Sequence, residues 1–230
     1  MSSESFPMSF ESFPCQLVSW REAYLLARGL ARSVKASKFC PDLVVAIGRG
    51  GFVPARTVCD FLLNDRLTSM KVEHYGLSAH RMDEVVIRYP LAADVKGQRL
   101  LIVDDVTDTG DTLKTAVAYV QGLEPAAIRT GVLQHKITST FQPDYFAEIV
   151  KEWRWIIYPW AAHEDLVGFT ERVLSKQLSS SSQIGDQLRE RYALMMDDET
   201  LREVLADLVE MGWADKSGNL YKKAPATGKS

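Results

Sequence analysis

One segment, residues 99–113, constrains the fold of this chain more than any other. It reads RLLIVDDVTDTGDTL: an apolar run at residues 100–103, two adjacent aspartates, and a loop rich in threonine. The apolar spacing from Leu113 onward is typical of a helix, so the segment predicts a buried strand, a loop and a helix. In open α/β sheets, ligands bind at the carboxyl ends of the strands. The segment therefore predicts an α/β fold with a ligand site at this sheet edge.

The threonine-rich loop has the composition of a phosphate site. A helix that follows a loop offers backbone N–H groups and a positive dipole end to an anion. Gly110 lets the backbone approach a phosphate closely, and Thr107, Thr109 and Thr112 can add hydroxyl donors without adding charge. If the backbone N–H groups bind the anion, the side chain of Asp111 can point to water. We therefore predict that this loop binds a phosphate group.

The two adjacent aspartates, Asp104 and Asp105, need a different partner, because two anions beside a phosphate would repel it. Carboxylates accept hydrogen bonds from vicinal hydroxyls, and a hard cation offsets the repulsion between carboxylate and phosphate. We predict that Asp104 and Asp105 bind ribose hydroxyls and hold Mg²⁺ through water, so that the whole stretch forms a ribose 5-phosphate site. The alternative is a solvated loop that is acidic by chance.

A second strand, loop and helix unit lies upstream, in the sequence PDLVVAIGRGGFVPARTVCDFL. Its apolar strand, residues 43–47, runs into Gly48, Arg49, Gly50 and Gly51. Arginine binds phosphate oxygens bidentately, and glycines expose their N–H groups. This turn is therefore a candidate diphosphate site, although such turns also serve only to close a tight connection between strand and helix.

The acidic pair with its threonine loop resembles the phosphoribosyl diphosphate signature of the type I phosphoribosyltransferases. The resemblance covers residues 17–174 and is strongest to the 6-oxopurine enzymes, whose bases are hypoxanthine, guanine and xanthine. It implies a mostly parallel sheet flanked by helices, a small base-binding hood, Mg²⁺ as cofactor, and transfer of phosphoribose to a base with release of diphosphate. Arg49, Gly50 and Gly51 match the family's diphosphate loop, which predicts a cis peptide bond between Gly48 and Arg49.

The same resemblance implies roles for residues that would contact the base. Asp108 matches the general base that accepts the proton of purine N7. Lys136 follows a predicted strand and matches a lysine that donates to the exocyclic oxygen, and an ammonium donor favours a keto oxygen over an amino group. Trp155 and Ile156 match an aromatic residue that stacks on the ring and a β-branched residue that holds its edge. Trp153 and Trp160 are weaker candidates for a base contact, and a core or interface position suits these tryptophans equally.

The chain of 230 residues predicts one α/β domain with a small appendage. The expected divisions follow from shifts in composition and periodicity: an N-terminal arm at 1–16, a phosphoribosyltransferase domain at 17–177, a four-serine linker at 179–182, and a helical module at 183–224. Within the domain, residues 76–94 resemble the family's flexible loop, with His80 and Arg81 as candidate ligand contacts.

The C-terminal module leaves an alternative function open. Two predicted helices, 183–196 and 198–211, and a hairpin at 212–221 resemble part of a winged helix. The protein could then be a DNA-binding regulator that senses phosphoribosyl diphosphate. However, residues 183–230 contain seven Lys and Arg against nine Asp and Glu, and DNA affinity is largely phosphate neutralisation. We therefore expect this module to serve in packing or assembly, and we do not expect nucleic acid as a partner.

Charge, apolar runs and cysteine content indicate which partners and which compartment to expect. The net charge is −3, so the chain has no broad basic field. Its apolar runs are too short to span a membrane, and no signal core precedes them. The three cysteines, Cys15, Cys40 and Cys59, lack metal-binding spacing, which favours reduced thiols in a cytoplasmic protein. A homodimer is expected by analogy with relatives, and a pyrimidine base remains an alternative substrate.

Overall fold

The protein is described by a computed structural model, which covers residues 12–75 and 84–225. The chain forms two compact units. Ser19–Trp153 makes up the first, called here the sheet unit. The segments before and after it, up to Val18 and from Arg154, make up the second, called here the terminal unit. In the described part of the chain, every helix is too short or too polar to span a bilayer.

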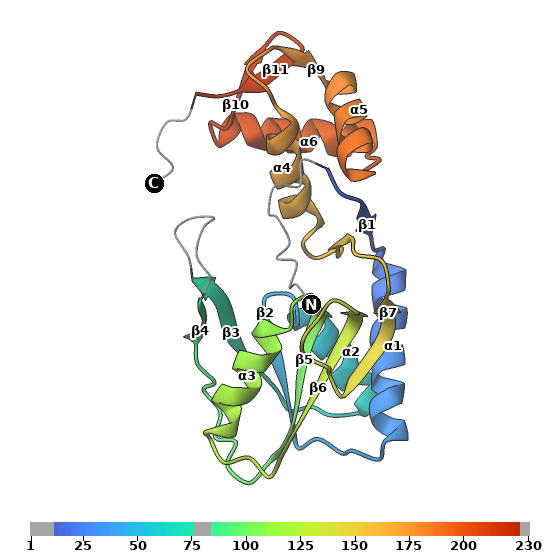
Figure 1. The fold of residues 1–230 in the computed structure, drawn as a ribbon, viewed down its shortest axis with the longest axis vertical. Helices are drawn as coiled ribbons and strands as arrows, with labels where there is room; N and C mark the ends of the chain where they lie inside the picture. The colour runs from blue at the N-terminus through green and yellow to red at the C-terminus, as the bar shows by residue number, and fades with distance from the viewer. Residues whose placement is uncertain (1–11, 76–83, 226–230) are drawn as a thin grey trace, which may run out of the picture. The chain divides into compact units, whose positions relative to one another are not determined.

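The sheet unit is built on six strands in the order β4-β3-β2-β5-β6-β7 (Figure 1). All neighbouring pairs are parallel except β3 and β4. The strand bounds are Leu43–Gly48 (β2), Leu67–Tyr75 (β3), Glu84–Tyr89 (β4), Arg99–Thr107 (β5), Ala127–Lys136 (β6) and Tyr145–Val150 (β7). The predicted mostly parallel sheet is therefore confirmed. Its order places β2, β5 and β6 side by side, so their carboxyl ends share one edge.

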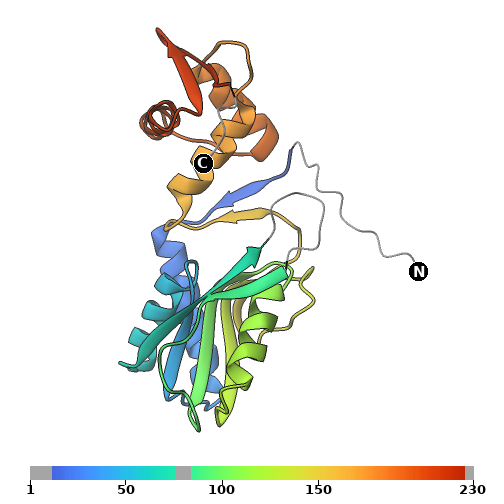
Figure 2. The same cartoon turned by 90° about the vertical axis from the view of Figure 1, so that its left-hand side faces the viewer.

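Helices cover both faces of this sheet (Figure 2). Two of them, α1 (Trp20–Ala36) and α2 (Phe52–Leu62), lie on one face, and α3 (Asp111–Gln121) lies on the other. Helix α1 begins with the capping box expected from the sequence, because the hydroxyl of Ser19 accepts from the backbone N–H of Glu22 and the Glu22 carboxylate accepts from that of Ser19.

The strands are apolar because both faces of the sheet are buried. All six residues of β2 are buried, and so are residues 100–104 of β5. Alternate residues pack on opposite faces: Val45 and Ile102 share a cluster with Leu113 and Val120 of α3. The loops that follow β2 and β5 therefore leave strands that are buried on both faces.

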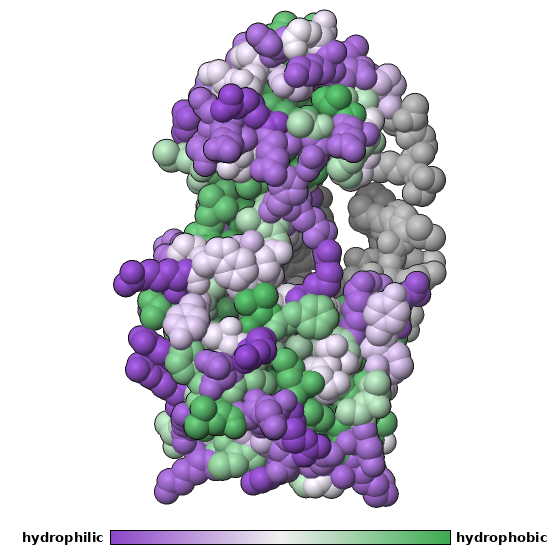
Figure 3. Space-filling view, turned by 180° about the vertical axis from the view of Figure 1, so that it is seen from behind, coloured by the Kyte–Doolittle hydropathy of each residue, from purple (hydrophilic) through white to green (hydrophobic). Residues whose placement is uncertain are grey.

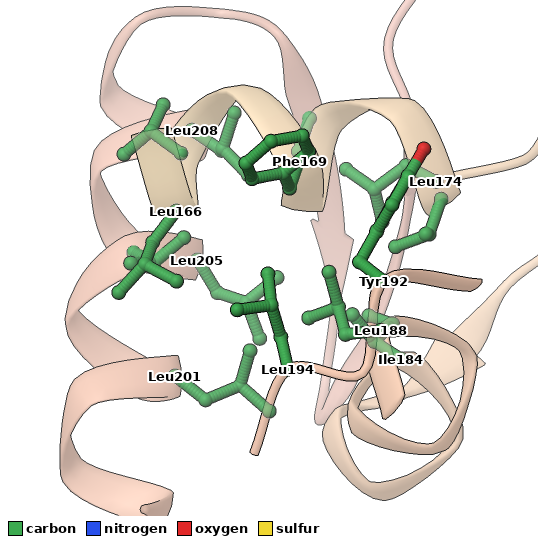
Figure 4. Packing of buried hydrophobic residues seen from close by; sticks show 14 of the residues in the cluster. Leu166, Phe169, Leu174, Ile184, Leu188, Tyr192, Leu194, Leu201, Leu205 and Leu208 are labelled. Atoms are coloured by element: carbon green, nitrogen blue, oxygen red, sulfur yellow. The ribbon is translucent and has the colours of Figure 1, made fainter. Parts of the chain in front are cut away.

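The described residues of the terminal unit form two small sheets and three helices. Strands β1 (Cys15–Leu17) and β8 (Trp155–Ile157) pair in parallel, and β10 (Ala214–Ser217), β11 (Leu220–Lys223) and β9 (Ser179–Ser180) form an antiparallel sheet in that order. The helices are α4 (Ala162–Val173), α5 (Ser181–Tyr192) and α6 (Asp198–Glu210). Figure 4 shows their shared core, in which Phe169 of α4 lies with Leu188 and Leu205. Both C-terminal helices and the hairpin predicted from the sequence are confirmed.

The four-serine linker was a wrong prediction. Ser179 and Ser180 pair with Tyr221 and Leu220 as strand β9. The hydroxyl of Ser180 also accepts from the backbone N–H of Gln183, which completes a capping box at the start of α5. Serine is a favoured N-cap because its short side chain reaches the free N–H groups of the first turn. These serines therefore begin a folded element.

Candidate functional site

The predicted motifs converge at one edge of the sheet unit. The turn with Arg49 follows β2, the acidic pair and threonine loop lie at the end of β5, and Lys136 ends β6. Since the strand order places β5 between β2 and β6, the three motifs are neighbours although they lie far apart in sequence.

The central strand is longer than its sequence predicted. We expected a strand at residues 100–103, but β5 continues through both aspartates to Thr107, paired with β6 in register as far as Thr107 and His135. Thr107 is therefore in the strand instead of the loop. It is buried, and its hydroxyl lies 3.0 Å from Nδ1 of His135. Burial lowers the pKa of His135, and a hydrogen bond with Gln142 opposes that shift.

The two aspartates of the acidic pair lie against backbone atoms. Asp104 is buried, and its Oδ1 accepts from the N–H of Asp105 at 3.0 Å. Burial raises the pKa of the Asp104 carboxyl well above its usual range, and the neighbouring charge of Asp105 adds to this shift. A Cβ placed on Gly50 would lie 2.6 Å from Cγ of Asp105. The turn after β2 and the acidic pair therefore touch, and only glycine fits this contact without movement.

The turn after β2 has the predicted cis peptide bond between Gly48 and Arg49. Gly51, at the N-cap of α2, donates its N–H to the carbonyl of Ile47 at 2.8 Å. A Cβ on Gly51 would lie 2.8 Å from that same carbonyl oxygen and 2.9 Å from the nitrogen of Ile47. The tight turn therefore requires glycine at residue 51 for packing.

The predicted phosphate loop is short, and Thr140 holds it through hydrogen bonds. Gly110 occupies the N-cap of α3 with φ 95°, a conformation that favours glycine. The backbone N–H and the hydroxyl of Thr140 both donate to the carbonyl of Thr109, at 2.9 and 3.0 Å. Asp111 and Thr112, in the first turn of α3, are half-buried. The sequence did not predict that Thr140 would hold this loop, and its only signal was a polar stretch between two strands.

Lys136 and Asp108 form an ion pair at the same edge. Nζ of Lys136 lies 2.7 Å from Oδ2 of Asp108, and the lysine side chain is 3% exposed against 39% for the aspartate. The indole N–H of Trp153 donates to the other carboxylate oxygen, Oδ1, at 3.2 Å. Nζ of Lys136 also lies 4.7 Å from the centroid of the Trp153 ring. The lysine is thus nearly buried between a carboxylate and an aromatic face.

The two remaining base-contact candidates belong to the terminal unit. Trp155 and Ile156 lie on β8, where Ile156 is buried and Trp155 is 38% exposed. The Trp155 ring packs edge-on to Phe169 at 6.1 Å and lies 6.5 Å from the ring of Phe13. Their roles in stacking on a base stay predictions. His80 and Arg81 lie outside the described residues.

The donor set at β5 fits a hard cation. Asp104 and Asp105 supply carboxylate oxygens, the ligands Mg²⁺ prefers, and a buried carboxyl beside a second one gains from a nearby positive charge. No cluster of three or more His, Cys, Asp or Glu side chains suited to a metal occurs within residues 12–75 and 84–225. Mg²⁺ would therefore be held as it usually is in nucleotide sites, by one or two carboxylates, water and substrate phosphates.

Comparison with known proteins agrees with this arrangement. The family model "Phosphoribosyl transferase domain" matches residues 16–165. Xanthine-guanine phosphoribosyltransferase of Idiomarina loihiensis is 29% identical over 147 residues, which cover 64% of this chain and 86% of the relative. Xanthine phosphoribosyltransferase 1 of Saccharomyces cerevisiae is 25% identical over 187 residues, covering 64% of this chain and 90% of the relative. Among solved structures, a purine phosphoribosyltransferase from Pyrococcus horikoshii superposes with a TM-score of 0.56 at 29% identity, covering 64% of this chain and 93% of its own.

Proposed function

Because this chain belongs to the phosphoribosyl transferase family, we propose that it transfers phosphoribose from phosphoribosyl diphosphate to a 6-oxopurine. The products are a nucleoside 5′-monophosphate and diphosphate, as in purine salvage. The observation that carries this proposal is the Lys136–Asp108 pair, joined at 2.7 Å beside the acidic pair. The names of the relatives, xanthine-guanine and xanthine phosphoribosyltransferase, support the same class of base.

The sugar phosphate would bind along β5 and the loop after it. Asp104 and Asp105 accept hydrogen bonds from the ribose hydroxyls, and the backbone N–H groups of residues 109–112 bind the 5′-phosphate. Arg49 binds the diphosphate with the N–H groups of Gly50 and Gly51. When bound, Mg²⁺ neutralises charge on the departing diphosphate. Fixed carboxylates beside the ribose stabilise the positive charge that grows on the ring as diphosphate leaves.

The base would be recognised by the ion pair. O6 and N7 of a 6-oxopurine lie on one edge of the ring, so a donor and an acceptor side by side can bind both. Lys136 donates to O6, and Asp108 accepts the N7 proton. An ammonium group has no acceptor, so it cannot pair with the amino group of adenine. Trp155 and Ile156 are proposed to hold the ring and its edge.

An assay of purified protein with phosphoribosyl diphosphate, Mg²⁺ and a panel of bases tests this function. We expect turnover with hypoxanthine, guanine or xanthine and little with adenine. Turnover confined to orotate or uracil would overturn the purine assignment. Absence of turnover with every base would overturn the enzymatic function itself. The relatives reported above are purine enzymes by name, and they lend no support to a pyrimidine enzyme or a DNA-binding regulator.

We also propose that the protein is a cytoplasmic homodimer. Large apolar side chains are exposed on or next to α1 and α2: Trp20 is 61% exposed, Tyr24 50% and Leu63 91%. The surface seen in Figure 3 carries hydrophobic residues among hydrophilic ones. Burying such side chains against a second copy would remove apolar area from water. The cysteines Cys15, Cys40 and Cys59 are free thiols, which suits a reducing compartment. Light scattering on the purified chain tests the dimer, and a monomeric mass at micromolar concentration would refute it.

A further inference from the structure

Trp153 contacts both members of the proposed base-recognition pair. Its indole N–H donates to Oδ1 of Asp108 at 3.2 Å, and its ring centroid lies 4.7 Å from Nζ of Lys136. The ion pair itself joins Nζ to the other oxygen, Oδ2, at 2.7 Å. Each oxygen of the Asp108 carboxylate thus has its own donor, one from Lys136 and one from Trp153.

Both contacts of Trp153 involve a charged group, which makes them stronger than contacts between neutral groups. A hydrogen bond to an ionised group is shorter and roughly twice as strong as a neutral one. A cation over an aromatic face is attracted by the ring quadrupole, and more so when it is shielded from water. The Lys136 side chain is only 3% exposed. The ring therefore replaces part of the hydration that the ammonium loses on burial.

We propose that Trp153 is a positioning residue for base recognition, an inference that rests on the proposed function. When a base enters, Lys136 would donate to O6 of the purine in place of Oδ2 of Asp108. Oδ2 is then free to face N7. The indole N–H remains on Oδ1 during this exchange and keeps the carboxylate aimed at the N7 proton, while the ring keeps the ammonium near the same edge.

Tryptophan combines the two properties that this role needs, an N–H donor and a broad π face. Phenylalanine keeps a face and loses the donor, whereas leucine loses both. Trp153→Phe and Trp153→Leu therefore separate the effect on Asp108 from the effect on Lys136. Trp213, which packs against the hydrophobic core of the terminal unit, provides a matched control as Trp213→Phe.

The first experiment measures kcat and both KM values for the full-length protein and its variants. We expect Trp153→Phe to lower kcat about tenfold, the effect of one hydrogen bond to a charged group. The KM for phosphoribosyl diphosphate should stay within about twofold, as for any variant that leaves β2 and β5 intact. Trp153→Leu should also raise the KM for the base, by about threefold, because it removes the cation–π contact. Trp213→Phe should leave all three constants near the wild-type values.

A double-mutant cycle separates positioning from simple loss of structure. In an Asp108→Asn background, Trp153→Phe should lower the remaining kcat by less than about twofold, because its effect acts through the carboxylate. An equal tenfold loss in both backgrounds would overturn the inference, and so would wild-type kcat in Trp153→Phe. Wild-type protein that is inactive with every base would instead refute the proposed function. Circular dichroism and a melting curve establish that each variant is folded.

Discussion

Removing either partner of the Lys136–Asp108 pair should have unequal effects on stability and similar effects on activity. The pair is unequal: the lysine side chain is 3% exposed and the aspartate side chain 39%. Lys136→Met removes the buried charge and fills the same space with an apolar chain. Asp108→Ala removes the exposed partner and leaves an ammonium group buried against Trp153.

The expected magnitudes follow from this inequality. Breaking a fully buried pair costs about 3–5 kcal/mol, because the remaining charge is uncompensated. After Lys136→Met, the remaining carboxylate is reached by water and by the N–H of Trp153, so we expect a change in unfolding free energy within about 1 kcal/mol. After Asp108→Ala, the ring of Trp153 offsets part of the penalty, and we expect a loss of about 2 kcal/mol.

Urea unfolding and steady-state kinetics on the two variants provide the assay. A loss of 2 kcal/mol corresponds to a fall in Tm of about 4–8 °C for a chain of this size. Both variants should lose activity: Lys136→Met because O6 of the base loses a charged donor, about 10–100-fold in kcat/KM, and Asp108→Ala because proton transfer is lost. If Lys136→Met proved the less stable of the two, the argument from unequal burial would be refuted.

Three further predictions concern the rest of the site. Gly51→Ala should destabilise the protein by about 1–3 kcal/mol in urea unfolding, because the added Cβ meets the backbone of Ile47 at 2.8 Å and cannot move it. Thr140→Val should raise the KM for phosphoribosyl diphosphate about three- to tenfold, because it removes one of two hydrogen bonds to the carbonyl of Thr109. Asp104→Asn should flatten the pH dependence of stability: burial raises the pKa of Asp104 in the folded state, so its contribution to stability falls as pH rises above about 4.

Each of these predictions has a result that would contradict it. Wild-type stability of Gly51→Ala would contradict the first prediction, because the added Cβ meets backbone atoms that cannot move aside as a side chain could. For Thr140→Val, it is an unchanged KM for phosphoribosyl diphosphate together with a raised KM for the base. For Asp104→Asn, unfolding free energies measured from pH 4 to pH 8 should diverge from wild type as pH rises, and parallel curves would refute the prediction.

Local patterns were enough to predict the elements that carry the phosphate motifs. The strand and turn of residues 43–51, the helix capped by Ser19 and the two C-terminal helices all have short-range signals, such as apolar runs and capping boxes. These signals depend on neighbours a few residues away. The structure therefore agrees with the sequence wherever local interactions decide the conformation.

The differences arise where distant segments meet. Asp104 and Asp105 look like the end of a strand, yet pairing with β6 extends β5 to Thr107. Ser179 looks like part of a linker, yet pairing with Tyr221 makes it a strand residue. The contact of Trp153 with Asp108 spans 45 positions. Such contacts depend on topology, which periodicity and local propensity do not describe.

The register between β5 and β6 has a consequence for how this site can vary. Thr107 lies opposite His135, so the residues that follow them, Asp108 and Lys136, lie at the same level, with Asp108 just beyond the end of β5 and Lys136 still paired with Val150 of β7. The backbones of Asp108 and Lys136 are then separated by the spacing of adjacent strands, about 4.8 Å. Insertions in the connections at the opposite edge would leave this spacing unchanged, whereas a one-residue slip of β6 would turn Lys136 to the other face. The pairing of β5 with β6 thus sets the distance between Asp108 and Lys136, and the loops around the site can differ in length without changing it.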